Sequence, residues 1–172
     1  MFEKKEISDL VNKLLETNGM STMPLIDLDL LLKSEGIKLF KFSKSEWKDK
    51  NFPDASAILL KSGNEKIIII NEQAHKLEED KIFTIAHEIG HFFLHTTEEK
   101  PYVLCRHGQS GDKEKEDEAD YFAACLLMPE KIFKELVNKV EIPSVKVFAK
   151  IFGVSETTTR KRFSELNIFC VD

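Results

Sequence analysis

Residues 83–91 read FTIAHEIGH, and the interpretation of the whole chain starts from this stretch. On a helix, His87 and His91 lie four residues apart, so both imidazoles project from one face. Two neutral imidazole nitrogens at this spacing can bind one Zn²⁺ ion. Glu88 follows His87 directly, where its carboxylate can reach a metal-activated water rather than the metal. The H-E-x-x-H pattern therefore predicts a metal centre with a general base beside it.

The helix that carries this pattern is predicted over residues 78–94. Its apolar positions cover most of the circumference and are Ile82, Phe83, Ile85, Ala86, Ile89, Phe92 and Phe93. A helix that is apolar nearly all round is buried in the core. Two histidines and a glutamate inside such a helix are expensive to bury unless a partner satisfies them. A bound metal ion is the partner that best explains all three.

A catalytic zinc site of this kind needs a third protein ligand and an open fourth position. A helix predicted over residues 114–127 begins in an acidic run and then turns apolar, so its first turns enter the core. Glu116 and Asp120 are four residues apart and share one face of it. Glu116 would then bind the metal, while Asp120 accepts the N–H of a liganding imidazole. Glu118, which projects about 200° away from Glu116, stays the main rival for the third ligand.

The two motifs together closely resemble the ImmA/IrrE family of zinc metallopeptidases. The matching residues are FTIAHEIGH at 83–91 and the pattern E-x-E-A-D-x-F-A-x-x-L-L-M-P at 116–129. The hairpin strand that ends at Ile70-Asn71 is also similar to that family. The resemblance, which covers roughly residues 56–130, implies a gluzincin-like site.

By this resemblance, the metal ligands are His87, His91 and Glu116, and the catalytic base is Glu88. Asp120 keeps the supporting role that its spacing predicts. The resemblance also implies that the strand containing Ile69, Ile70 and Asn71 lines the substrate cleft and binds substrate.

Members of the family cleave helix-turn-helix repressors of mobile elements or stress regulons. The resemblance therefore implies a zinc-dependent endopeptidase that hydrolyses a peptide bond in such a repressor and so relieves repression. Mn²⁺ stays an alternative ion, because the affinity order of divalent metals only favours Zn²⁺. A different class of function stays open, namely a non-catalytic DNA- or protein-binding regulator with a structural or vestigial metal site. Glu88 favours the enzyme, because a structural site has no use for a general base beside an open coordination position.

The expected fold is α+β, a mainly helical zincin-like domain with a small, mostly antiparallel sheet and C-terminal helix-turn-helix-like helices. Residues 1–140 are predicted to form the metallopeptidase domain, with residues 141–172 as a helical tail packed on it. Strands are predicted at 37–42, 57–60 and 67–70, the last two forming a hairpin. The other predicted helices cover 3–17, 24–36, 132–140, 143–151 and 155–166. Residues 43–54 and 96–112 are predicted to be loops.

The tail resembles a helix-turn-helix over residues 147–163, with Arg160, Lys161 and Arg162 on its second helix. DNA binding by this helix is one interpretation. However, Thr159 stands where an aliphatic residue usually seats a recognition helix. Residues 131–172 also hold only 8 Lys and Arg against 5 Asp and Glu, and residues 1–130 hold 17 against 25. Packing or partner docking is therefore favoured over DNA binding.

Composition is typical of one globular domain: 172 residues, 42% hydrophobic, with a net charge of −5. No apolar run approaches the ~20 residues that span a bilayer, so no membrane association is expected. The charged N-terminus lacks the apolar core of a signal peptide. Three widely spaced cysteines argue against a disulfide framework. A cytoplasmic location is therefore expected.

Overall fold

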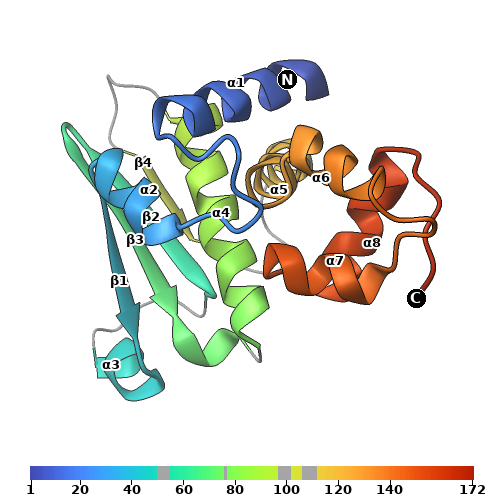
Figure 1. Ribbon diagram of the computed structural model, residues 1–172. Coiled ribbons are helices and arrows are strands. Elements are labelled where there is room, and N and C mark those ends of the chain that lie inside the picture. The colour runs from blue at the N-terminus through green and yellow to red at the C-terminus, as the bar shows by residue number, and fades with distance from the viewer. Residues whose placement is uncertain (50–54, 76, 97–101, 106–111) are drawn as a thin grey trace.

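A computed structural model describes residues 1–49, 55–75, 77–96, 102–105 and 112–172 of the chain. The predicted α+β fold is confirmed. A mixed sheet forms one side of the molecule, the long helix α4 (Glu78–His95) packs against it, and α5 (Lys113–Leu127) packs against α4 (Figure 1). The H-E-x-x-H helix is thus the central layer, and this explains why it is apolar nearly all round.

The sheet has four strands in the order β1-β3-β2-β4. Their bounds are Ile37–Phe42 for β1, Ala57–Ser62 for β2, Glu65–Asn71 for β3 and Tyr102–Cys105 for β4. β1 runs parallel to β3, and the β2–β3 and β2–β4 pairings are antiparallel, as the mostly antiparallel sheet was predicted to be. β3 is an interior strand with a neighbour on each side.

The predicted hairpin joins β2 to β3 through a two-residue turn. Ser62 pairs with Glu65, so Gly63 and Asn64 are the turn residues. Gly63 adopts a φ of 54°, the left-handed conformation that two-residue hairpin turns require. The turn chemistry sets the register that places Ile68 and Ile70 in the main core.

The remaining helices surround α4 and α5. They are α1 (Lys4–Thr17), α2 (Leu28–Ser34), α3 (Lys44–Asp49), α6 (Glu130–Val137), α7 (Val145–Phe152) and α8 (Glu156–Glu165), with a 3₁₀ turn at Glu72–Ala74. α1 crosses over α5, and α6, α7 and α8 gather on the side of α4 away from the sheet (Figure 1). Among the described residues, no helix has the length and apolar character needed to cross a bilayer.

The second helix starts later than predicted. It begins at Leu28 instead of at residue 24, and Leu25 lies before it with 60% of its surface exposed. The reason is local, because the Asp27 carboxylate accepts a hydrogen bond from Leu30 N at 2.9 Å and so caps the helix there. A proline at position 24 permits a helix start but does not enforce one.

Residues 43–54 were predicted to be a loop, and this was wrong for the described part, which contains helix α3. Ser43 N donates to the Glu46 carboxylate at 2.9 Å, half of the capping box that an S-x-x-E pattern encodes. Trp47 then buries its side chain with Ile58 and Ile69 in a small second core. The capping signal was present in the sequence but was outweighed by the polar composition.

Residues 96–112 were also predicted to be a loop, yet residues 102–105 form β4. This strand adds to the edge of β2, with Leu59 opposite Leu104. A four-residue strand has little local signal of its own. Its existence depends on the free hydrogen-bonding edge that β2 offers after the hairpin has formed.

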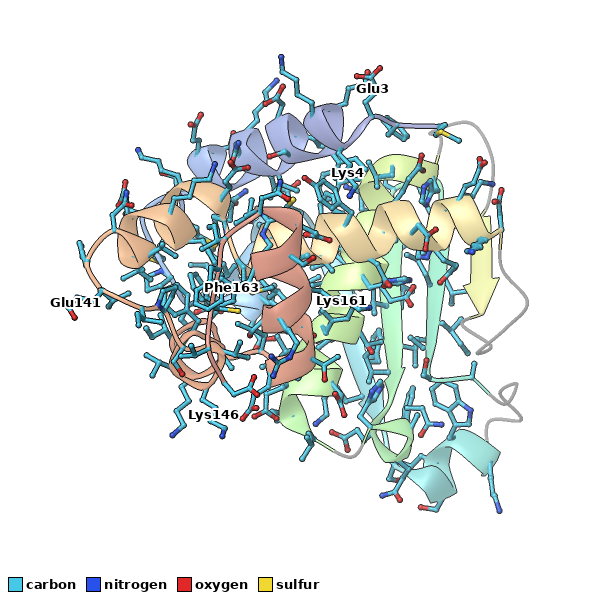
Figure 2. The ribbon with its side chains drawn as sticks, turned by 90° about the vertical axis from the view of Figure 1, so that its right-hand side faces the viewer. Glu3, Lys4, Glu141, Lys146, Lys161 and Phe163 are labelled. Carbon is cyan, nitrogen blue, oxygen red and sulfur yellow. The ribbon has the colours of Figure 1, made fainter. Side chains whose placement is uncertain are left out.

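The C-terminal helices are joined to α6 by a cluster of phenylalanines. The ring of Phe133 on α6 lies 4.9 Å from Phe148 on α7 and 4.8 Å from Phe163 on α8, centroid to centroid. Figure 2 shows Phe163 and Lys161 on opposite sides of α8. The inner face of this helix pair is therefore used for packing within the chain.

Arg162, one of the three basic residues on which the DNA-binding interpretation depends, is buried with 1% of its surface exposed. Its Nε donates to the Met128 carbonyl at 3.2 Å, and its Nη1 pairs with Glu165 at 3.2 Å. Arg160 is exposed, but its guanidinium is 2.5 Å from the Asp172 carboxylate. Two of the three basic residues of α8 are thus engaged within the chain, which weakens the DNA-binding interpretation.

Replacing Arg162 with alanine is expected to lower the free energy of unfolding by about 2–4 kcal/mol, because a buried carbonyl and a carboxylate lose their donor. Arg160→Ala, two residues away on the exposed face, is expected to change it by less than about 0.5 kcal/mol. Urea denaturation of both variants measures the difference. An unchanged stability of Arg162→Ala combined with lost DNA binding would restore the recognition-helix interpretation.

Candidate metal centre

α4 carries His87, Glu88 and His91 into the middle of the molecule. Their exposed fractions are 0%, 0% and 1%. The neighbouring Ile85, Ala86 and Ile89 belong to the main hydrophobic core. Burying three polar side chains in such surroundings is costly unless they are paired or coordinate a metal. The burial predicted from the periodicity of the sequence is what the structure shows.

α5 brings two acidic residues to the same place. Its start is capped by Asp112, whose carboxylate accepts from Glu114 N at 3.2 Å. This start leaves Glu116 in the first turn, with 31% of its side chain exposed, while Ala119 one turn later is fully buried. Glu116 therefore sits where the helix enters the core, with one side toward α4 and the other toward solvent.

Gly90 lets the two helices approach closely. A Cβ added at Gly90 would lie 3.1 Å from Phe122 Cβ and 3.2 Å from both Cα and the carbonyl oxygen of Ala119. Such contacts are tighter than ordinary van der Waals packing, and two of the three atoms belong to the α5 backbone. The missing side chain of Gly90 and the small one of Ala119 thus allow Glu116 to reach the histidines.

Three ligand atoms converge between α4 and α5. His87 Nε2 and His91 Nε2 are 2.9 Å apart, and the Glu116 carboxylate lies 3.3 Å from the first and 3.2 Å from the second. Ligand atoms around a tetrahedral zinc ion lie roughly 3.3 Å from one another. Within the described part of the chain, His87, His91 and Glu116 form the group of His, Cys, Asp or Glu side chains that could hold a metal ion.

The charge state of Glu116 suits a metal ligand. Its contacts with the imidazole of His87 and then with that of His91 hold the pKa of its carboxyl far below the ordinary value, against the opposing effect of burial. Glu116 is therefore a carboxylate at neutral pH. Two imidazoles and one carboxylate form a donor set typical of catalytic zinc, which leaves a fourth position open.

Asp120 lies behind the first histidine. Its carboxylate oxygen is 2.8 Å from His87 Nδ1, the contact that its spacing from Glu116 predicted. When Nδ1 carries the proton and donates it to Asp120, the lone pair of Nε2 faces the cluster. The contact with Asp120 is thus the one that the metal-binding tautomer of His87 would make.

Glu118, the rival third ligand, lies outside the cluster. Its Oε2 is 2.8 Å from His95 Nε2, one helical turn beyond His91. The angular offset on α5 explains this, because residues two apart point to different sides of a helix. His95 and Gly90 were not among the predicted site residues. The sequence signals for them are a third histidine at the same spacing of four and a glycine inside an otherwise apolar buried helix.

The structure provides no support for substrate binding by Ile69, Ile70 and Asn71. Ile70 is fully buried in the main core, and Ile69 is 6% exposed in the second core. Asn71 pairs with β1 through its backbone and donates its side-chain amide to the Ala55 carbonyl at 3.2 Å. Because β3 is interior, it has no free edge to which an extended peptide could add; the outer strands are β1 and β4.

Replacing Gly90 with alanine tests the close approach of the helices. Helix propensity alone predicts a gain of up to about 1 kcal/mol from this change. We expect a loss of about 1–3 kcal/mol instead, together with weaker metal binding, because the Ala119 backbone cannot yield without moving Glu116. Thermal unfolding without metal and a zinc titration measure the two effects. A more stable variant with unchanged zinc affinity contradicts this role of Gly90.

Comparisons with known proteins agree with this geometry. The sequence model of the IrrE N-terminal-like domain, peptidase family M78, matches residues 32–164. Among solved structures, a Mycobacterium tuberculosis transcriptional regulator is similar, with a TM-score of 0.59 and 18% identity over 93% of this chain and 46% of that chain. This likeness shows the fold alone, and the chain spans a little under half of that regulator's length. No curated protein sequence matches significantly.

Because the family model covers well over half of the residues and includes the cluster of His87, His91 and Glu116, the chain belongs to the IrrE N-terminal-like domain family of metallopeptidases.

Proposed function

We propose that the protein is a zinc-dependent endopeptidase that cleaves a helix-turn-helix transcriptional repressor and thereby relieves repression of a mobile element or stress regulon. The observation that carries the enzymatic part is the cluster of His87, His91 and Glu116, with the buried Glu88 next to His87 in α4. Family membership supports a metallopeptidase. The regulatory context is supported by the similar fold of a protein described as a transcriptional regulator.

In the proposed reaction, His87, His91 and Glu116 would hold the metal. A bound Zn²⁺ would lower the pKa of water to about 7 and would polarise a carbonyl oxygen, and Mn²⁺ would be an alternative ion. Glu88 accepts a proton from the attacking water and then delivers it to the nitrogen of the leaving amine. Water adds to the carbonyl carbon, the C–N bond breaks, and the products are a carboxylic acid and an amine. The buried position of Glu88 keeps bulk water from competing for this proton.

A cavity of about 360 Å³ lies between α5 and α8 and is lined by Asp120 of α5 and by Thr158 and Lys161 of α8. Asp120 contacts His87 Nδ1, so the cavity lies on the side of His87 that faces away from the three ligand atoms. The inner face of α8 packs against α6 through Phe133 and Phe163. We propose that residues 141–172 are a tail that packs on the metallopeptidase domain of residues 1–140 and serves packing or partner docking rather than DNA binding.

The proposed function is tested with purified protein and with cells. Metal analysis after purification should find about one zinc ion per chain. Labelling of newly formed N-termini in extracts of the source organism, with and without added protein, should then identify cleaved proteins, with helix-turn-helix repressors among them. The strongest candidate is cleaved again in isolation. A zinc-loaded protein that produces no new N-termini under conditions that activate the cells contradicts the endopeptidase proposal.

A further inference from the structure

The last turn of α4 carries a third histidine that the proposed reaction does not use. His95 follows His91 by four residues, and only 3% of its side chain is exposed. Its Nδ1 is 2.8 Å from His91 Nδ1, and its Nε2 is 2.8 Å from Glu118 Oε2. His95 therefore connects a proposed metal ligand on α4 to a carboxylate on α5.

These contacts are satisfied together by a single arrangement of protons. His91 needs the lone pair of Nε2 for the metal, so its proton is on Nδ1. Nδ1 of His95 must then be unprotonated, so that it accepts the hydrogen bond that His91 Nδ1–H donates. The N–H of His95 is consequently on Nε2 and donates to the Glu118 carboxylate.

Glu118 is itself held in place. Its side chain is only 10% exposed, and its second oxygen accepts a hydrogen bond from Phe2 N at 2.5 Å. The amide comes from the segment just before α1, which crosses over α5 (Figure 1). A chain of three hydrogen bonds thus runs from the N-terminal segment through Glu118 and His95 to His91.

The two proposed histidine ligands are therefore supported differently. His87 has a direct carboxylate partner in Asp120, whereas His91 reaches its carboxylate through an intervening imidazole. Partners of this kind fix the tautomer and the ring orientation of a metal ligand, and their loss typically weakens metal binding 10- to 100-fold.

We propose that His95 is a positioning residue that, together with Glu118, holds His91 in its metal-binding tautomer and orientation. This inference rests on the metal site of the proposed function. It assigns no contact with the substrate or the metal to His95.

The experiment measures the Zn²⁺ affinity of the metal-free full chain by competition with a chromophoric chelator. His95→Phe fills the ring volume without nitrogen atoms and should weaken Zn²⁺ binding by about 10- to 100-fold. His95→Asn places an oxygen one bond from Cγ, as Nδ1 is, so it can still accept from His91 and should recover most of the affinity. A purely space-filling role predicts the reverse order, because phenylalanine is the closer match in volume.

Glu118→Ala provides a second variant in case His95→Phe does not fold. It should weaken Zn²⁺ binding severalfold or more, while Asp117→Ala, an exposed acid one residue earlier on α5, should leave it unchanged. Thermal unfolding of each metal-free variant confirms that folded proteins are compared. The ¹⁵N chemical shifts of His91 in the zinc-loaded wild type should show a protonated Nδ1.

The outcomes separate this inference from the proposed function. If the wild type binds Zn²⁺, His95→Phe binds it more weakly and His95→Asn recovers most of the affinity, the positioning role is supported. Tight binding by wild type and equally tight binding by His95→Phe and Glu118→Ala overturns it and leaves the proposed function intact. A folded wild-type chain that binds no Zn²⁺ overturns both.

Discussion

Glu88→Gln is expected to reduce peptide hydrolysis by about 10²- to 10⁴-fold while leaving zinc bound. Glutamine has nearly the same shape, so the buried position in α4 stays filled. Its amide cannot accept a proton from water at neutral pH, and the proton transfers to and from the substrate therefore lose their carrier. Initial cleavage rates of an identified substrate and the zinc content of the same preparation measure the two quantities together.

Glu79→Gln is a matched control, because it makes the same chemical change in the first turn of α4, away from the cluster. Its cleavage rate and zinc content should equal those of the wild type. A fully active Glu88→Gln variant would remove Glu88 from the mechanism. An inactive variant that has also lost its zinc would assign Glu88 to metal binding instead of proton transfer.

Glu116→Ala is expected to have the largest effect on metal binding, with an affinity loss of about 10²-fold or more. The carboxylate supplies both the third donor atom and the negative charge of the cluster. Zinc that binds only the folded state stabilises it by about 4 kcal/mol when its free concentration is a thousand times its dissociation constant. Added zinc should therefore raise the melting temperature of the wild type much more than that of Glu116→Ala, which gains about 1.4 kcal/mol or less at the same zinc concentration.

Glu114→Ala is the control for this prediction. Glu114 is an exposed acid in the same first turn of α5 and lies outside the cluster. Equal stabilisation of wild type and Glu116→Ala by zinc would show that the ion binds elsewhere or uses another third ligand. Glu118 would then be the next residue to replace, although its contact with His95 places it away from the two Nε2 atoms.

Local sequence patterns predicted most of the helices and the hairpin. The buried α4 follows from its apolar circumference, and the β2–β3 turn follows from Gly63 and Asn64. The errors have two different causes. For α3, Ser43 and Glu46 are a local capping signal, but the polar composition of residues 43–54 favoured a loop. For β4, no local signal was strong enough, because a short edge strand is stabilised by its neighbour.

The same distinction applies to the candidate site. The spacing of His87 and His91, the place of Glu88 directly after His87 and the shared face of Glu116 and Asp120 are properties of single helices, so the sequence by itself determined them. Family membership could likewise be predicted, because it is carried by these same motifs.

Only the tertiary structure decided how the two helices meet. Gly90 against Ala119 sets their separation, and this separation brings the Glu116 carboxylate within 3.3 Å of both Nε2 atoms. The tertiary structure also brings Glu118 into contact with His95 and places β3 between two other strands of the sheet. Helical and strand periodicities fix the direction of a side chain relative to its own element. The distance between elements depends on packing between residues far apart in sequence, which no local pattern records.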